Sequence, residues 1–233
     1  LIPLIMKKVY LLLTLISVSV FAQKKFENIQ SEKLGQERRI TIGLPASYEA
    51  NPNKKYPVLY LLDGDYLFDA FSGAVSYGSY WDDLPEMIII GIHQNKNEER
   101  YDDTTIDEIE GLPFEKGAQF FEFIGAELIP HIEKKYRTTP FRIIAGHDTT
   151  ASFLNFYLYK ENPIFKAYIS FSPELAPKME VRIPEKFAKL TEPFFYYLSV
   201  ADGDNKKLKE PIEKLDSNIK IANNPLVNYK YYV

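Results

Sequence analysis

The residues best suited to chemistry lie in the stretch IIAGHDTTAS, positions 143–152. Two isoleucines lead into a turn of small residues, and an apolar run with helical character follows from Phe153 to Tyr159. A strand, a sharp elbow and a helix in this order expose the central residue of the turn, where the pattern Gly-x-Ser-x-Gly carries a serine nucleophile. Here Asp148 stands in the serine position and Thr150 in that of the closing glycine. The stretch therefore predicts an elbow with an altered nucleophile.

An aspartate at this position is compatible with more than one chemistry. A serine hydroxyl attacks poorly until a neighbouring base removes its proton, whereas a carboxylate is already ionised. Thr150 is β-branched and stiff where a glycine would keep the turn permissive, and Thr149 alters the shape beside the nucleophile position. These changes fit lost catalysis, and they also fit a site rebuilt for another ligand. The sequence leaves both interpretations open.

Other polar residues have structural interpretations. Ser152 lies about one helical turn after Asp148 and is expected to pack in the helix, while Ser170 and Ser172 lie at a strand end. The chain has no cysteine, which excludes disulfides and thiolate metal sites. Its three histidines are far apart and lack the spacing of metal ligands, so no metal site or cofactor is predicted (His93, His131 and His147).

The composition is that of a folded protein of 233 residues with a formal net charge of −4. Its 17 tyrosines and 16 phenylalanines argue against disorder over most of the chain. No basic cluster stands out, which argues against nucleic acid as a partner.

The N-terminal residues predict a targeting segment. Met6, Lys7 and Lys8 provide a positively charged start, and VYLLLTLISVSVFA is a short apolar run that ends in small residues. This pattern indicates a bacterial-type signal peptide over residues 1–22 that is cleaved after Ala22. Within this range, residues 1–5 stand before the start methionine Met6 and are interpreted as upstream sequence. A membrane anchor is the alternative, but the run is short for a span and a polar stretch follows at once. We expect an exported, periplasmic or extracellular protein without a stable membrane span after cleavage.

Strands and helices are predicted to alternate along the rest of the chain. The segment 38–45 alternates polar and apolar residues and predicts an antiparallel strand. Continuous apolar runs predict strands that are buried on both faces of a mostly parallel sheet. The expected strands are 38–45, 57–65, 86–92, 142–148, 165–173, 193–204 and 227–233, and the expected helices are 120–136, 153–159 and 205–217. We therefore predict one α/β domain over residues 23–233.

Several of these segments together resemble a known family. The stretches are SEKLGQERRITIGLPASY, YPVLYLLDGDYLF, IIIGI, FIGAELIPHIEKKYRTTPFRIIAGH and AYISFSP, in this order from about Ser31 onward. They resemble the putative esterases of the α/β-hydrolase superfamily, which include esterase D-like and enterochelin esterase-like enzymes. The resemblance implies a three-layer fold, with a mostly parallel central sheet between helices, and the hydrolysis of small-molecule carboxylic esters.

The resemblance also implies roles for particular residues around the elbow. The nucleophile position is Asp148. The oxyanion hole would use the backbone N–H of Thr149 and one from the region of Gly64, Asp65 and Tyr66, because such donors stabilise the charge of a tetrahedral intermediate.

The remaining members of the implied catalytic set follow later strands. The acid position corresponds to Asp204, with Asp202 as the alternative. The family's catalytic histidine follows the last strand, and that position lies beyond Val233, so we expect the chain to be truncated at its C-terminus. His147 corresponds to a structural elbow residue rather than to the catalytic base.

Two further segments near the strand ends have alternative interpretations. The acidic stretch 98–111 is interpreted first as a solvated loop, and second as a loop in which Arg100 and Asp102 border the substrate cleft. His93 is interpreted as a loop residue that could line the pocket, since it follows a strand at the ligand side of the sheet.

Three functional hypotheses follow. The leading one is an exported member of the esterase family that lacks ordinary serine-esterase activity, because Asp148 replaces the nucleophile. The second is an active hydrolase that uses Asp148 as nucleophile with a histidine beyond Val233, as the similarity of GHD to haloalkane dehalogenases and epoxide hydrolases suggests. The third is a non-catalytic protein that binds an envelope-associated ligand in the retained pocket.

Overall fold

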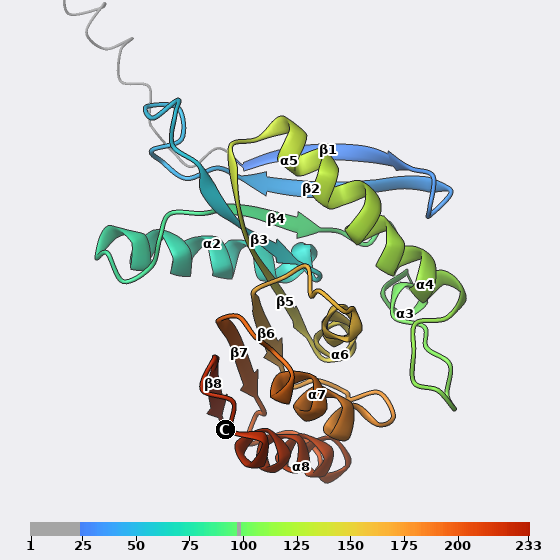
Figure 1. The fold of residues 1–233 in the computed structure, drawn as a ribbon. Helices are drawn as coiled ribbons and strands as arrows, with labels where there is room; N and C mark the ends of the chain where they lie inside the picture. The colour runs from blue at the N-terminus through green and yellow to red at the C-terminus, as the bar shows by residue number, and fades with distance from the viewer. Residues whose placement is uncertain (1–23, 97–98) are drawn as a thin grey trace, which may run out of the picture.

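The computed structural model describes residues 24–96 and 99–233 (Figure 1). The signal-peptide prediction for residues 1–22 lies outside this part of the chain. The described residues form an eight-stranded sheet with the order β1-β2-β4-β3-β5-β6-β7-β8. The strands are β1 (Lys24–Ser31), β2 (Gln36–Gly43), β3 (Tyr56–Leu61), β4 (Ile88–Ile92), β5 (Thr138–His147), β6 (Ala167–Phe171), β7 (Phe194–Ser199) and β8 (Val227–Tyr232).

The sheet is mostly parallel, as predicted. The hairpin of β1 and β2 is antiparallel, and β2 pairs antiparallel with β4. From β4 through β3, β5, β6 and β7 to β8 every pairing is parallel. The strand IIIGI of β4 is buried along its whole length, which is the expected state for a continuous apolar run with layers on both faces.

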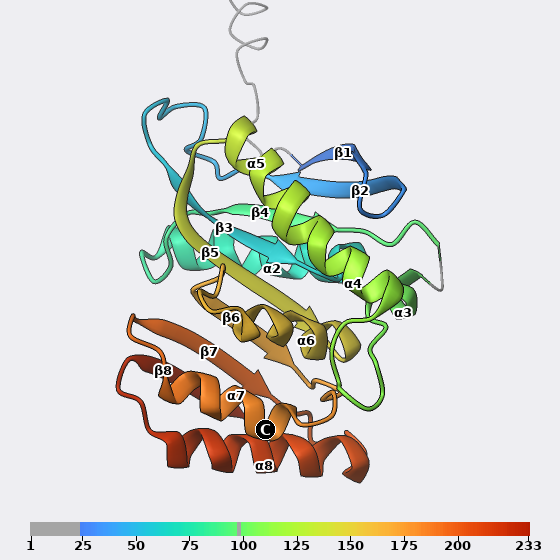
Figure 2. The same cartoon turned by 45° about the vertical axis from the view of Figure 1, so that its right-hand side comes forward.

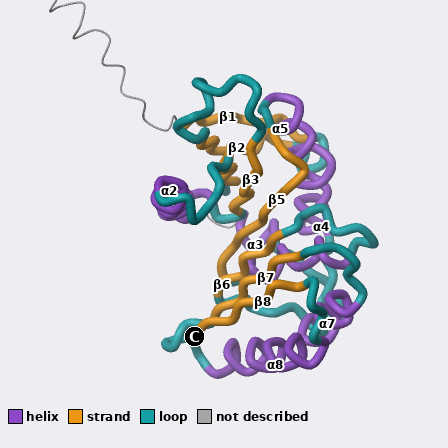
Figure 3. Tube along the Cα trace, turned by 60° about the vertical axis from the view of Figure 1, so that its left-hand side comes forward, coloured by secondary structure: helices purple, strands orange, loops and turns teal. Residues whose placement is uncertain are grey.

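Helices cover both faces of the sheet and complete the predicted three-layer architecture (Figures 2 and 3). Helix α2 lies on one face, and α4, α5, α6, α7 and α8 lie on the other. The helical segments are α2 (Gly64–Tyr80), α3 (Glu99–Asp103), α4 (Glu115–Glu122), a π-helical turn (Phe123–Leu128), α5 (Ile129–Lys135), α6 (Thr149–Phe153), a 3-10 turn (Leu154–Tyr159), α7 (Met179–Ala188) and α8 (Lys206–Ala222). No helix in this set of residues combines the length and the apolar character that crossing a membrane requires.

Four elements were not predicted from the sequence: β1, α2, α3 and α7. Strand β1 carries four charged or polar residues on exposed positions and buries Ile29, a composition typical of an edge strand. Helix α2 contains three glycines and few strong helix formers, so its propensity is low. It is stabilised instead by the burial of Phe68 and Val75 against the sheet.

The helix predicted over 120–136 is interrupted by the π-helical turn between α4 and α5. Pro130 stands at the start of α5 and has no N–H for the carbonyl four residues earlier. The turn before it absorbs this lost hydrogen bond by widening. The helix predicted over 153–159 is likewise a 3-10 turn that continues the short helix α6.

The connection from β3 to α2 brings two backbones into direct contact. A Cβ atom on Gly64 would lie 2.5 Å from the carbonyl carbon of Gly91 in β4, closer than any real side chain approaches backbone. Glycine is therefore required at position 64 for α2 to begin immediately at the end of the sheet.

We predict that Gly64→Ala lowers the free energy of unfolding by about 1–3 kcal/mol, the usual cost of forcing an extra methyl group into packed structure. The matched control is Gly73→Ala in the same helix, where an added Cβ meets nothing within 4 Å. This control should raise stability by up to about 1 kcal/mol through helix propensity. Urea denaturation of both variants measures the two effects, and equal stabilities would contradict the packing argument.

Candidate functional site

The elbow lies between β5, which ends at His147, and α6, which begins at Thr149. Asp148 adopts φ 59° and ψ −120°, a conformation that costs energy for any residue with a side chain. Its side chain is 37% exposed, so the carboxylate is accessible at the carboxyl edge of the sheet. The structure thus places Asp148 in the strained, accessible position that a nucleophile occupies in such a turn.

Backbone donors lie next to this position. Thr149 is the first residue of α6, and Gly64 and Asp65 are the first residues of α2, where N–H groups have no acceptor inside the helix. The N–H of Tyr66 is already directed to the carbonyl of Asp63 at 3.3 Å. Of the predicted oxyanion-hole residues, Gly64 and Asp65 therefore remain the better placed donors from α2.

A buried carboxylate below the elbow was missed by the sequence analysis. Asp63 is fully buried at the end of β3 and precedes α2 without capping it through its side chain. It accepts hydrogen bonds from Nε of Arg100 at 2.8 Å, from the N–H of His147 at 3.0 Å and from the hydroxyl of Thr150. The available signal was a charged residue directly after the apolar run PVLYLL, because a carboxylate in such a place needs donors around it.

Arg100 joins the buried carboxylate to the elbow. Besides Asp63, its guanidinium lies 3.3 Å from Oδ2 of Asp148 and donates to the carbonyl of His147 at 2.5 Å. Burial alone would lower the pKa of Arg100. The hydrogen bond to Asp63 and the negative charge of Asp63 outweigh this effect and raise the pKa above its usual value, so the side chain stays cationic. The second interpretation of segment 98–111, with Arg100 beside the cleft, agrees with this position.

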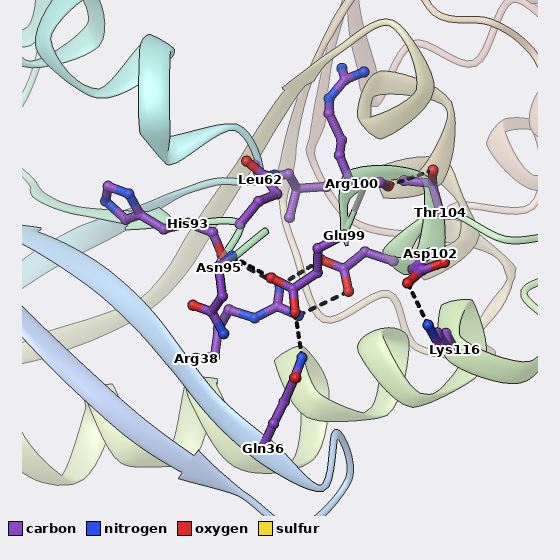
Figure 4. A network of polar contacts seen from close by, with 12 residues as sticks. Gln36, Arg38, Leu62, His93, Asn95, Glu99, Arg100, Asp102, Thr104 and Lys116 are labelled. Carbon is purple, nitrogen blue, oxygen red and sulfur yellow. Dashed lines mark hydrogen bonds and ion pairs between the residues drawn. The ribbon is translucent and has the colours of Figure 1, made fainter. Parts of the chain in front are cut away.

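The first interpretation of that segment, a solvated loop, is wrong for residues 99–103. They form helix α3, and both Glu99 and Asp103 are buried. The cause is Arg38 of β2, a fully buried cation whose charge must be matched (Figure 4). Arg38 makes a two-pronged pair with Asp103, at 2.5 and 2.9 Å, and lies 3.4 Å from Glu99. This pairing fixes α3 against the sheet and so sets the position of Arg100.

Thr150 has a specific role at the base of the elbow. It is buried, and its hydroxyl contacts the carboxylate of Asp63 as well as the N–H and carbonyl of His147, at 3.0 and 2.9 Å. The residue expected to stiffen the turn therefore also binds it to the buried carboxylate.

Two histidines near the elbow are held by neighbouring side chains. Nδ1 of His147 lies 3.1 Å from the hydroxyl of Tyr66, whose pKa is raised to about 12 by burial and by the charge of Asp63. His93 pairs through Nδ1 with Asp65 at 2.6 Å and through Nε2 with Thr41. His93 therefore anchors the first turn of α2.

The two candidates for the acid position lie away from this cluster of contacts. Oδ2 of Asp204 accepts from the N–H of Ala201 at 2.8 Å, inside its own turn. Asp202 is exposed, and Lys209 donates to its carbonyl oxygen at 2.6 Å. Neither carboxylate contacts the elbow or a histidine in the described part of the chain.

The serines after the elbow have the packing roles expected for them. Ser152 is buried and accepts from the N–H of Ala176 at 3.0 Å, and Ser170 donates to the carbonyl of Ala151 at 3.0 Å. Ser172 accepts from the N–H of Ala201 at 3.2 Å.

A cavity of about 420 Å³ opens beside Thr149. Its wall is formed by α3 and the loop after it, by α6 and the following 3-10 turn, and by the loop after β6. This volume lies within the range of small-molecule sites. Within residues 24–96 and 99–233, no group of three or more histidine, aspartate or glutamate side chains converges as a metal site would require.

Comparison with known proteins agrees with this geometry. A model of the family described as putative esterase matches residues 31–218. The chain belongs to the putative esterase family. This membership confirms the resemblance found in the sequence, and the α/β-hydrolase fold is confirmed as well. A search of curated proteins returned no match.

Several solved structures share the fold of this esterase-family chain. An uncharacterised protein from Capnocytophaga ochracea is 26% identical with a TM-score of 0.81, and an IroE-like serine hydrolase from Shewanella oneidensis is 24% identical with a TM-score of 0.74. Ferric enterobactin esterase from Salmonella typhimurium is 14% identical with a TM-score of 0.67. Each alignment covers 91% of this chain, but 57%, 74% and 53% of the three other chains in the same order.

The buried pair of Arg38 and Asp103 generates a prediction on pH. Burial raises the pKa of Asp103 from 3.8 to about 6, and the nearby charge of Glu99 adds to this. The folded state therefore holds this proton more tightly than the unfolded chain. The resulting stabilisation is complete below pH 3.8 and is lost as the pH rises through about 6. Two pKa units correspond to about 3 kcal/mol.

The measurement compares the free energy of unfolding of wild type and Asp103→Asn across this pH range. As the pH rises, the free energy of unfolding of the wild type should fall by up to about 3 kcal/mol relative to that of Asp103→Asn, because asparagine does not titrate. Asp69→Asn is the control, since Asp69 is exposed and pairs with Lys24. A pH-independent difference for Asp103→Asn would refute the assignment.

Proposed function

We propose that this protein is an exported member of the esterase family that has lost ordinary serine-esterase activity and retains its cavity to bind a small ligand. The observation that carries the proposal is the ion pair between Asp148 and Arg100 at the elbow, with Arg100 held in turn by the buried carboxylate of Asp63.

The ion pair opposes nucleophilic attack for a physical reason. A carboxylate that faces a guanidinium is stabilised as an anion, and attack would consume that charge at the moment the new bond forms. A serine-type mechanism also needs a hydroxyl and a base in hydrogen-bond contact. At the nucleophile position a carboxylate replaces the hydroxyl, and the histidines of the described residues pair with other groups: His93 with Asp65, His131 with Glu27 and His147 with Tyr66.

The proposed export rests on the sequence of residues 1–22, with its lysine pair and short apolar run. An exported binder would meet its ligand in the periplasm or outside the cell, and the proposed ligand is a small-molecule ester or another envelope-associated compound.

A second candidate is hydrolysis with Asp148 as the nucleophile. It is favoured by the conformation of Asp148 and by the N–H of Thr149 beside it, which could stabilise an oxyanion. In that reaction the carboxylate oxygen would displace the alcohol of an ester and form an acyl intermediate on Asp148. A histidine-activated water would then attack the carbonyl carbon of Asp148 and release the acid. The histidines of the described residues pair with other groups, so this candidate requires a further histidine.

We predict that the protein does not hydrolyse short-chain aryl esters above the rate of the Asp148→Ala variant, because the attacking group is held by Arg100. Release of the aryl alcohol by the full chain measures this. The matched control is Glu161→Ala, an exposed carboxylate outside the site. Turnover that survives in the control and disappears in Asp148→Ala would overturn the proposal.

Isotope labelling distinguishes the two candidates directly. Incubation with ester in 18O-labelled water should leave the peptide that contains Asp148 unlabelled, in the wild type and in Arg100→Gln. If Asp148 forms an acyl anhydride that water then opens at the carbonyl carbon of Asp148, its carboxylate acquires 18O, and mass spectrometry of that peptide would report it.

A further inference from the structure

The cavity beside the elbow has a chemical character that indicates its ligand. We infer that it binds an organic cation, in which an ammonium or guanidinium group is attached to an apolar or aromatic body. This inference rests on the proposed function, because it assigns the ligand class of the same cavity.

The inner wall of the cavity is apolar and aromatic. Phe153 and Phe156 are buried there, with ring centroids 5.6 Å apart in an edge-to-face arrangement. Tyr101 of α3 faces the same space and is 67% exposed. Aromatic rings attract cations to their faces, and the attraction is stronger where water is partly excluded. The exposed ring of Tyr101 can therefore meet a cation, whereas Phe153 and Phe156, 1% and 3% exposed, contribute only the apolar floor beneath it.

The rim of the cavity carries negative charge. Glu108 and Glu174 line it, and no lysine, arginine or histidine does. In the described part of the chain neither carboxylate forms an ion pair, while the nearest cations are engaged elsewhere: Arg100 with Asp63 and Asp148, and Lys178 and Arg182 with Glu110. A bound cation would supply the missing counter-charge, whereas an anionic ligand would face two uncompensated carboxylates.

The loop that carries Glu174 is fixed relative to the elbow. The N–H of Glu174 donates to the carbonyl of Asp148 at 3.3 Å, and the N–H of Ala176 donates to the hydroxyl of Ser152 at 3.0 Å. The cavity therefore offers a negatively charged rim that is fixed relative to the elbow.

The test uses the full chain and three aromatic probes of similar size that differ in charge: the cation benzyltrimethylammonium, the neutral compound benzyl alcohol and the anion phenylacetate. Calorimetry and thermal melting should show binding in the order cation, neutral compound, anion. The affinity for benzyltrimethylammonium should fall with added salt, because its pairs with Glu108 and Glu174 are screened.

Variants assign the binding to this cavity. Glu108→Gln and Glu174→Gln should each weaken cation binding by about three- to fivefold, the size of a partly exposed ion pair. Tyr101→Leu, an exposed change that leaves the core intact, should weaken it similarly through the lost ring. Glu161→Gln, a carboxylate exposed elsewhere, should leave the affinity unchanged.

Two outcomes would overturn the inference: phenylacetate binding as tightly as the cation, or cation affinity that is absent or insensitive to Glu108→Gln and Glu174→Gln. Failure here is distinct from failure of the proposed function. Ester turnover that depends on Asp148 would overturn the proposed function whatever the probes do. Absent cation binding without turnover would overturn the ligand class alone.

Discussion

A carboxylate buried at the end of β3 must be surrounded by donors, and the organisation of the elbow follows from how Asp63 meets this requirement. Leaving an ionised carboxylate unpaired in the interior would cost several kcal/mol, so each partner of Asp63 is constrained in position. The partners are the guanidinium of Arg100, the hydroxyl of Thr150 and the N–H of His147. Because the last two belong to the elbow, the turn that presents Asp148 is tied to the sheet through one buried charge.

The position of Arg100 depends in turn on a second buried charge. Arg38 pairs with Asp103 and approaches Glu99, which attaches α3 to β2 and turns Arg100 toward the elbow. Two carboxylates share a single buried guanidinium here, so the arrangement holds one negative charge more than it neutralises. Burial raises the pKa of Asp103 despite its pairing with Arg38, and the charge of Glu99 adds a smaller contribution in the same direction.

These charges change what the esterase scaffold can do at its elbow. The fold presents Asp148 in a strained and accessible conformation, and the N-termini of α2 and α6 supply backbone donors near it. The guanidinium of Arg100 stabilises the Asp148 anion before any reaction, which under the proposed function weakens its tendency to attack. The same cation is engaged by Asp63 and Asp148, so it does not act as a counter-charge for Glu108 and Glu174, which line the cavity.

The amino-acid sequence by itself determined the positions of most strands along the chain, the mostly parallel sheet, the esterase family and the elbow at Asp148. These features depend on local signals: unbroken apolar runs such as IIIGI, and a strand followed by a turn of small residues. Helix α2 was not predicted, because its glycine-rich sequence has a low helix propensity. It is helical because Phe68 and Val75 are buried against the sheet. The roles of Asp63, Arg100 and Arg38 were decided by tertiary structure alone. Their pairings join residues far apart in the chain, and an acidic stretch at 98–111 looks solvated until the buried cation that it neutralises is known.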